Sequence, residues 1–311
     1  MSVSVQGKAE LGTRVLKSVS RSFYLSLRLL PAEMREGAAV GYLLARASDT
    51  IADTPGVSVA ARLEMLAAFA RVVATGEQGL PDLQAVESDC EPGERVLLEH
   101  AGELLAWLER LPKPIAAAVR KVVETIISGQ RLDLERFGRA SAQAPVCLKS
   151  AEELDDYCQR VAGCVGGFWT ELGFAALGAG FSAADPVKLC EMGCRYGRAL
   201  QLVNILRDTP KDLRDGRCYL PVGDPSDRDA LMAAHRAWQM KAGGLLQDGF
   251  DYVGTLHGRR LRAASVLPAL LARRTLAHLA KSDWAALEAR VKIPRREVYV
   301  ALAESFLCFG G

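Results

Sequence analysis

Apolar residues recur along most of the chain at the spacing of an α-helix, every three or four positions. The period is clearest in the segments 62–74, 95–111, 114–137 and 267–279. The alternation that is typical of strands is nearly absent, and short runs rich in Pro, Gly and Asp separate the helical segments. We therefore predict roughly ten or more helices and no sheet. No Pro-, Gly- or Ser-rich linker divides the chain, so one all-α domain over residues 1–311 is expected.

Composition limits the classes of function. The 311 residues carry a net charge of only +2, which gives no electrostatic reason to expect nucleic-acid binding. The eight cysteines are scattered without a CxxC pair, so reduced thiols in a cytoplasmic protein are expected rather than disulfides or zinc. No apolar run reaches the roughly 18–20 residues of a spanning helix. We expect no transmembrane helix, and at most peripheral contact with a membrane.

The segment LLARASDTIADT, residues 43–54, places two acids within an apolar helix. Tyr42, Arg46, Asp49 and Asp53 follow one another at spacings of four, three and four, so they share one helix face. The residues between them are mostly small or apolar, which is typical of a buried helix. Buried carboxylates one turn apart repel each other unless a cation or another partner compensates them. Taken alone, this motif leaves two interpretations open, a metal site and a solvent-exposed acidic face, of which the exposed face is the simpler.

A second acidic face is predicted in residues 197–221, GRALQLVNILRDTPKDLRDGRCYLP. Gln201, Asn204, Asp208 and Asp212 are spaced by three, four and four residues in a segment rich in Leu, Val and Ile. Pro210 lies between the two acids, lacks a backbone N–H and disfavours helical geometry at the residue before it. We therefore expect the helix to kink or end at Pro210, which makes Asp212 the least securely placed acid.

The side chains of both faces offer oxygen ligands without histidine or thiolate, a donor set that suits Mg²⁺ better than zinc. Mg²⁺ usually binds through one or two carboxylates, water and substrate phosphates, and the adjacent Arg46 and Arg207 match phosphate oxygens with paired N–H donors. Two such faces indicate a diphosphate held by Mg²⁺. Departure of diphosphate in an apolar cavity leaves an allylic cation protected from water. The residues therefore favour an enzyme that ionises a prenyl diphosphate.

Four blocks of this sequence resemble the squalene and phytoene synthase family: SVSRSFYLSLRLLP, YLLARASDTIAD, YCQRVAGCVGGFW and NILRDTPKDLRDGRCYLP. The likeness extends from about residue 15 to about residue 300, and the order and spacing of the blocks make it specific. It implies a single-domain, all-α isoprenoid synthase helical bundle with a central apolar cavity. In that fold the two aspartate motifs face each other across the cavity.

The resemblance also implies roles for individual residues. Mg²⁺ would be bound by Asp49, Asp53, Asn204, Asp208 and Asp212. The diphosphate pocket would be lined by Ser20, Arg21, Phe23, Tyr42, Arg46, Gln201 and Asn204, with Arg207 neutralising charge. Tyr157 in YCQRVAG matches a tyrosine assigned to proton handling or cation stabilisation, and a core tyrosine is the alternative. Gly163 and Gly166 are expected both to permit close helix packing and to leave room for a prenyl chain.

Members of this family differ in substrate length and in whether NADPH reduces the intermediate. The segment ARVKIPRREV, residues 289–298, resembles the basic segment with which squalene synthases hold NADPH. The implied cofactor-binding residues are Lys292 and Arg295, together with Arg21, Arg46 and Arg207. A solvated basic turn is the alternative. No GxGxxG follows a predicted strand, so NADPH would have to bind the helical domain itself.

The favoured interpretation is a bacterial-type squalene synthase, a farnesyl-diphosphate farnesyltransferase of sterol or hopanoid biosynthesis. Two farnesyl diphosphates would condense through presqualene diphosphate, and NADPH would reduce the product to squalene. The sequence departs from that pattern at Ala52 and Thr54, where acids are frequent, and at Pro294, where a basic residue is common. The alternatives within the family are presqualene diphosphate, dehydrosqualene or phytoene synthases that lack the reductive step.

Two further classes remain open. One is a non-catalytic subunit that binds prenyl lipids or assists assembly, and the other is a helical scaffold whose acids are solvated. Intact acids in both motifs, with arginines beside them, favour the enzyme. Transient membrane contact for release of an apolar product is expected, and no obligatory protein partner is evident.

Overall fold

The computed structural model describes residues 11–20, 23–77 and 79–307. In these residues the regular structure is helical apart from one short pair of strands, so the all-α prediction is confirmed. The prediction of no sheet is wrong in this one detail. β1 (Val146–Cys147) and β2 (Arg217–Cys218) pair in parallel, and the N–H of Val146 donates to the carbonyl of Gly216 at 2.8 Å. The two strands satisfy each other's backbone N–H and C=O groups. Hydrophobic periodicity in the sequence does not reveal such a short pairing.

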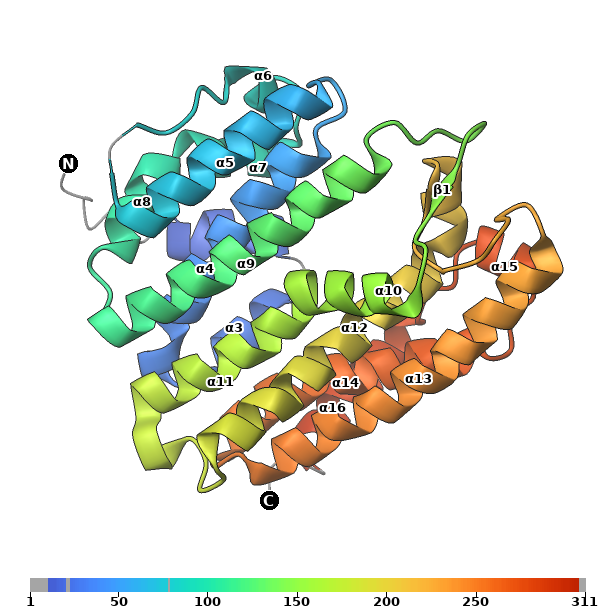
Figure 1. Ribbon diagram of the computed structural model, residues 1–311. Helices are drawn as coiled ribbons and strands as arrows, with labels where there is room; N and C mark the ends of the chain where they lie inside the picture. Colours follow the sequence, from blue (N-terminus) through green and yellow to red (C-terminus); the bar gives the residue numbers. More distant parts are fainter. Residues whose placement is uncertain (1–10, 21–22, 78, 308–311) are drawn as a thin grey trace. The chain divides into compact units, whose positions relative to one another are not determined.

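Contacts divide the chain into two compact units, Met1–Glu135 with Glu171–Ala179, and Arg136–Thr170 with Gly180–Gly311. The first unit contains π-helix η1 (Leu11–Val15), α2 (Leu16–Ser20), α3 (Phe23–Leu29), α4 (Ala32–Asp53), α5 (Val59–Thr75), α6 (Gln84–Glu87), α7 (Pro92–Glu99), α8 (Ala101–Leu108) and most of α9 (Lys113–Phe137) (Figure 1). A single domain over the whole length stays a prediction.

The second unit begins within the end of α9. Its elements are α10 (Ala151–Cys158), π-helix η2 (Gln159–Gly163), the first half of α11 (Cys164–Leu177), α12 (Pro186–Arg214), α13 (Arg228–Thr255), α14 (Arg259–Leu279), α15 (Trp284–Glu288) and α16 (Arg295–Leu307), besides the two strands. The 3₁₀ turn η3 (Gly178–Gly180) lies at the boundary between the units.

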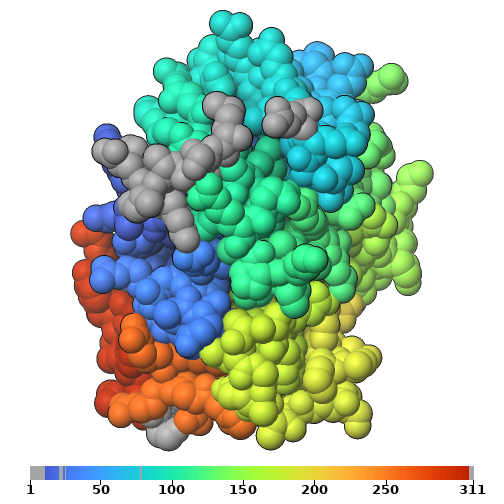
Figure 2. All heavy atoms as spheres, turned by 90° about the vertical axis from the view of Figure 1, so that its left-hand side faces the viewer, coloured from blue at the N-terminus to red at the C-terminus, as the bar shows by residue number. Residues whose placement is uncertain are grey.

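Helix α4, which carries the first acidic motif, is buried over most of its length. Leu43, Leu44 and Ile51 are fully buried, and α5, α7 and α8 pack against the helix. A Cβ atom at Gly37 would lie 2.6 Å from Ile115, so the absence of a side chain there permits the close approach of α9. The space-filling view shows the neighbouring α5 to α8, blue to cyan, as a closely packed surface (Figure 2). The apolar residues of the motif therefore fix the orientation of its acids.

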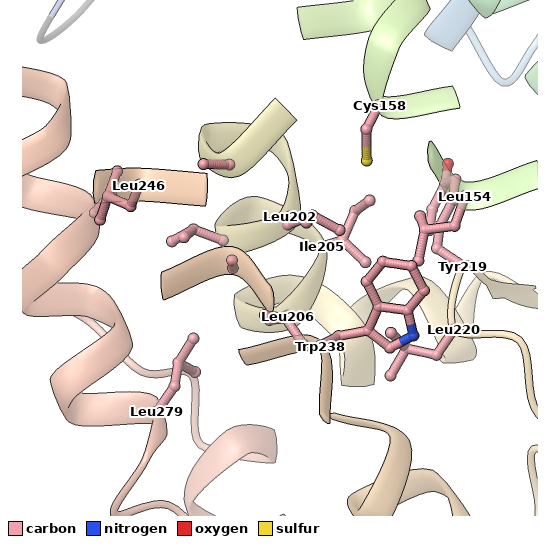
Figure 3. Close-up of a cluster of buried hydrophobic side chains, with 14 of the residues drawn as sticks. Leu154, Cys158, Leu202, Ile205, Leu206, Tyr219, Leu220, Trp238, Leu246 and Leu279 are labelled. Carbon is pink, nitrogen blue, oxygen red and sulfur yellow. The ribbon is translucent and has the colours of Figure 1, made fainter. Parts of the chain in front are cut away.

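Helix α12, which carries the second acidic motif, packs against α13 and α14 in the second unit. Its Leu202 and Leu206 join a cluster of buried side chains with Trp238, Leu246 and Leu279 (Figure 3). Burial of one large aliphatic side chain stabilises a fold by about 1.5–3 kcal/mol. This cluster therefore fixes which face of α12 remains for polar residues.

Glycines bring α11 and η2 into backbone contact with α12. A Cβ atom at Gly166 would overlap the carbonyl oxygen of Gly193, and one at Gly197 would overlap that of Ala162. A Cβ atom at Gly193 would in turn lie 2.6 Å from the carbonyl oxygen of Gly166. The prediction that Gly166 permits close helix packing is confirmed. At Gly163 the nearest atoms belong to the side chains of Gln159 and Arg198, and room for a prenyl chain stays a prediction.

The expected end of the helix at Pro210 is absent, because α12 runs through it to Arg214, and a kink there stays a prediction. A proline cannot donate to the carbonyl four residues earlier, which here belongs to Leu206. That carbonyl oxygen lies 2.8 Å from Nε2 of His235 on α13. A side chain from the adjacent helix thus replaces the missing backbone donor, and Asp212 stays on the helix.

One described helical stretch, Ala151–Gly180, is long and apolar enough to cross a membrane by length and composition alone. The stretch is not an uninterrupted apolar run, because it contains Arg160 and Glu171, and the expected absence of a transmembrane helix stays a prediction. The stretch includes the π-helix η2 and the glycines that contact α12, and core helices of soluble proteins pass the same test. The finding is weak evidence for a membrane span.

Candidate functional site

The first acidic motif lies on the last three turns of α4, as the spacing predicts. Asp49 is partly buried, whereas Asp53 is exposed at the end of the helix. Burial, and secondarily the charge of Asp53, raise the pKa of Asp49 from its ordinary 3.8 to about 7. Gln130 of α9 donates an amide hydrogen bond to the Asp49 carboxylate and opposes this rise. The protein's own residues therefore stabilise the charged form of Asp49 only in part.

A pocket of about 320 Å³ lies beside the end of α4. Its lining is strongly polar: Arg46, Asp49, Thr50, Asp53, Thr54, Pro55, Asp89, Cys90, Glu91, Pro92 and Glu94. The predicted phosphate-binding Arg46 forms an ion pair with Glu94 of α7. The size and polarity of this pocket suit a hydrated cation with phosphate oxygens rather than a prenyl chain. The predicted central apolar cavity stays a prediction.

The remaining predicted residues of the first unit have different outcomes. Tyr42 donates its hydroxyl hydrogen bond to the carbonyl of Val19 at 2.9 Å, which ties α4 to α2. Ser20 is buried and donates to the carbonyl of Leu16 within its own helix. Arg21 lies outside the described residues. Phe23 is the first residue of α3, and its side chain is likewise outside the description.

Asp49→Asn is expected to stabilise the metal-free protein above neutral pH. The raised pKa means that folding favours the neutral carboxyl, so this stabilisation is complete below about pH 4 and is lost as the pH rises through about 7. Asparagine mimics the neutral form, so the variant should gain little below about pH 4 and clearly more stability at pH 8 than at pH 5. Thermal unfolding in a chelator at both pH values measures this; an equal effect at both would contradict the assignment.

The second acidic motif forms one polar face along α12. Gln201 and Asn204 lie within reach of each other, with Nδ2 of Asn204 at 3.5 Å from Oε1 of Gln201. Arg207 holds the Asp208 carboxylate through two hydrogen bonds, from Nε at 3.0 Å and from Nη2 at 2.5 Å. Such a bidentate pair fixes the orientation of the carboxylate. Arg207 therefore orients an acid in this structure, besides its predicted role toward diphosphate.

Asp212 lies one turn beyond Asp208 on the same face. Burial raises its pKa to about 7; the charge of Arg217 opposes the rise, and that of Asp208 adds to it. Arg217 belongs to β2, so the small strand pair places a cation near the last turn of α12. Asp212 thus resembles Asp49, because each is a partly buried acid with a close acidic neighbour.

Tyr157 is half-buried near the C-terminal end of α10, directly before the π-helix η2. Its ring stacks on Tyr219 with the centroids 4.9 Å apart, and the two hydroxyl oxygens are 3.5 Å apart. Phe137 packs edge-on against Tyr219 with the centroids 5.1 Å apart. π-Helical turns often occur at functional sites. Tyr157 is thus neither a fully buried core residue nor an exposed one, and its catalytic role stays a prediction.

The predicted cofactor residues Lys292 and Arg295 are both exposed. Lys292 lies in the irregular segment between α15 and α16, and Arg295 is the first residue of α16. They share the second unit with Arg207, whereas Arg46 belongs to the first unit. The structure brings Lys292 and Arg295 to the same short connection, and NADPH binding there stays a prediction.

The donor set of both motifs fits Mg²⁺. Among the described residues, no group of three or more His, Cys, Asp or Glu side chains could by itself hold a metal ion. Each motif instead offers paired carboxylates, and one acid in each has a pKa raised to about 7, a charge that a divalent cation would compensate. The Oε1 atom of Gln130, beside Asp49, is buried without a hydrogen-bond partner. That two motifs of different units face each other stays a prediction.

Three residues were not anticipated from the sequence: Gln130, Glu94 and Tyr219. Gln130 is 81 positions from the acid that it contacts. Glu94 pairs with Arg46 across 48 positions, and Tyr219 stacks on Tyr157 across 62. The only sequence signal for Tyr219 is its place in the fourth block, RCYLP, where it follows the second motif.

Comparison with known proteins agrees with this geometry. The family model of squalene/phytoene synthase matches residues 16–297. A phytoene synthase of Thermus thermophilus is 31% identical over 308 residues, which cover 94% of this chain and 91% of the relative. A presqualene diphosphate synthase of Zymomonas mobilis is 30% identical over 236 residues, covering 71% of this chain and 67% of the relative.

Among solved structures, the squalene synthase TcSQS in complex with the ligand E5700 is similar with a TM-score of 0.79. The likeness covers 96% of this chain and 86% of that one at 22% sequence identity, so it supports the fold alone. It agrees with the predicted all-α isoprenoid synthase fold. From the family match and the two relatives, the chain belongs to the squalene/phytoene synthase family of head-to-head prenyltransferases.

Proposed function

We propose that this chain is a squalene synthase, which condenses two farnesyl diphosphates through presqualene diphosphate and reduces the product with NADPH. The observation that carries the condensation is the pair of partly buried acids, Asp49 and Asp212, each with a pKa raised to about 7 and each beside a second acid. Paired carboxylates of this kind on helices suit Mg²⁺-bound diphosphate. The basic connection at Lys292 and Arg295 supports the reductive step.

Ionisation breaks the bond between C1 of the prenyl chain and the diphosphate oxygen, and diphosphate leaves with the electron pair. Bound Mg²⁺ supplies charge neutralisation to the leaving group. Asp49 and Asp53 would hold Mg²⁺ in the first motif, and Asp208 and Asp212 in the second, with Asn204 as a neutral oxygen ligand. Arg46 and Arg207 stand beside these acids and would neutralise further diphosphate charge.

The prenyl cation then alkylates the double bond of the second substrate, and loss of one proton closes the cyclopropane of presqualene diphosphate. Tyr157 would assist this step, since its hydroxyl lies 3.5 Å from that of Tyr219 and its ring is held by stacking. A held aromatic ring stabilises a cation through its π face, and the paired hydroxyls give the proton a path. NADPH, which Lys292 and Arg295 would hold, would supply hydride to the rearranged cation once the second diphosphate has left.

Product identity tests the proposal. The purified chain is incubated with farnesyl diphosphate and Mg²⁺, with and without NADPH, and the lipids are identified by mass spectrometry. Squalene formed only with NADPH supports the reductive synthase, and Lys292→Ala with Arg295→Ala should then raise the KM for NADPH about tenfold or more with little change in the KM for farnesyl diphosphate. Presqualene diphosphate or dehydrosqualene regardless of NADPH would contradict the reductive step.

Two relatives each support an alternative function for this chain. The presqualene diphosphate synthase at 30% identity supports a chain that stops at the cyclopropyl intermediate. The phytoene synthase at 31% identity supports the longer geranylgeranyl diphosphate as substrate. The same incubation, repeated with geranylgeranyl diphosphate, decides between them, because turnover of geranylgeranyl but not farnesyl diphosphate identifies a phytoene synthase.

We also propose that the chain contacts a membrane transiently when it releases its apolar product, and that α16 makes the contact. Four large apolar side chains on this helix are exposed: Tyr299 at 68%, Val300 at 55%, Phe306 at 36% and Leu307 at 79%. The exposed Arg295 and Arg296 begin the helix. Both acids of the helix are engaged elsewhere, Glu297 with His278 and Glu304 with the arginines 273 and 274. An apolar face with free cations suits an anionic membrane surface.

Co-sedimentation with lipid vesicles tests this contact. Vesicles that contain phosphatidylglycerol should retain the protein more strongly than phosphatidylcholine alone, and Tyr299→Ser with Leu307→Ser should abolish the difference. Equal retention of both proteins would contradict the assignment to α16. Concentration-dependent self-association that the same variant abolishes would instead identify the face as a contact between two copies of the chain.

A further inference from the structure

The second acidic motif contains a proline at a position where a helix normally needs a donor. Pro210 lies between Asp208 and Asp212, and its missing N–H leaves the carbonyl of Leu206 without its usual partner. A proline inside a helix costs about 3 kcal/mol or more and usually kinks it. The helix nevertheless continues to Arg214. Some other interaction therefore supports this turn.

That interaction comes from His235 on α13. The His235 side chain is fully buried, and its Nε2 lies 2.8 Å from the carbonyl oxygen of Leu206. Its Nδ1 lies 2.7 Å from Nε2 of Gln239, one turn further along α13. A carbonyl only accepts, so Nε2 carries the hydrogen and Nδ1 accepts from the Gln239 amide. Burial lowers the pKa of His235, which agrees with a neutral ring.

The surroundings hold this ring in place. Leu206, whose carbonyl lies beside the ring, and Trp238, which precedes Gln239 in the sequence, both belong to the buried cluster of the second unit (Figure 3). The Leu206 carbonyl sets the tautomer, Gln239 holds the other ring nitrogen, and the packing of α12 on α13 fixes the distance. The donor is therefore available at the one carbonyl that Pro210 leaves open.

We propose that His235 is a positioning residue for the second acidic motif, which holds the proline-containing turn of α12 in helical geometry and so aligns Asp208 with Asp212. His235 acts through the carbonyl of Leu206 rather than through direct contact with either acid. The proposal deepens the function proposed above, because it concerns the acids assigned there to Mg²⁺. His235 lies outside the four sequence blocks that resemble the family.

A double-mutant cycle tests the proposal. Pro210→Ala restores an N–H at residue 210, which can bond the Leu206 carbonyl and makes the imidazole donor unnecessary. His235→Leu alone should weaken binding of Mn²⁺ with inorganic diphosphate about tenfold, the loss typical of residues that orient metal ligands. In the Pro210→Ala background the same substitution should weaken this binding by less than about threefold. His235→Gln, which keeps an N–H donor, should restore part of the affinity.

Calorimetric titration with Mn²⁺ and diphosphate provides the readout, so a chain that fails to turn over farnesyl diphosphate still yields an answer. Equal losses in the two backgrounds would overturn the proposal, because a purely packing role for His235 does not depend on residue 210. If His235→Leu alone does not fold, the proposal requires that the double variant does. Failure of both to fold would overturn it as well.

Discussion

Replacing Asp49 or Asp208 by asparagine is expected to lower the turnover of farnesyl diphosphate by about a thousandfold, while the protein stays folded. Each substitution removes the negative charge of one proposed Mg²⁺ ligand and leaves the shape of the side chain nearly unchanged. At Asp49 the variant keeps an oxygen for the amide of Gln130, and at Asp208 it keeps one for Arg207. Because the leaving diphosphate develops charge as it departs, the loss should fall on kcat as well as on KM.

Steady-state kinetics at saturating Mg²⁺ measures this effect. The control is Asp251→Asn, which changes an exposed acid on α13 that accepts a hydrogen bond from Gln247. This variant should retain turnover within about twofold, as surface substitutions normally do. Near-normal turnover of either motif variant would show that its acid does not act in catalysis.

Gly166→Ala is expected to prevent stable folding of the second unit. The new methyl group would overlap the carbonyl oxygen of Gly193, and both groups belong to helix backbones that cannot move independently. Overpacking in a core costs about 1–3 kcal/mol when side chains can adjust, and a clash with backbone exceeds that range. The free energy of unfolding should therefore fall by more than about 3 kcal/mol, which is a large part of a typical domain's stability.

The matched control is Gly244→Ala on α13, where a Cβ atom would meet nothing within 4 Å. Alanine in a helix interior is favoured over glycine by about 0.5–1 kcal/mol, so this variant should unfold at the same or a slightly higher temperature. Circular dichroism during heating compares the two. Equal melting of both variants and the unchanged protein would contradict the backbone contact between α11 and α12.

The helices and the composition of the two acidic faces could be predicted from the sequence, because both depend on local spacing. Asp49 with Asp53, and Asp208 with Asp212, lie along their helices as the spacing of four residues requires. The same local reasoning failed at Pro210. The rule that proline breaks a helix considers only the backbone, and the compensating donor, His235, comes from another helix.

The partners of the site residues could not be predicted for a similar reason. Gln130, which contacts Asp49, is one of many polar residues on a long helix, and nothing in its neighbourhood marks it. The ion pair of Arg46 with Glu94 and the stacking of Tyr157 on Tyr219 also join distant segments. Sequence patterns indicate which face of a helix is polar, whereas tertiary packing decides what that face meets.

The central claim is that the acids of each motif bind Mg²⁺ together with the substrate diphosphate. The most direct test is calorimetric binding of a farnesyl diphosphate analogue in which sulfur replaces the oxygen that joins the chain to diphosphate, so that it does not ionise. Asp53→Asn, in the first motif, and Asp212→Asn, in the second, should each weaken Mg²⁺-dependent binding about tenfold or more, and binding to the unchanged protein should require Mg²⁺. Unaltered affinity in either variant, or equal affinity with a chelator in place of Mg²⁺, would contradict the claim.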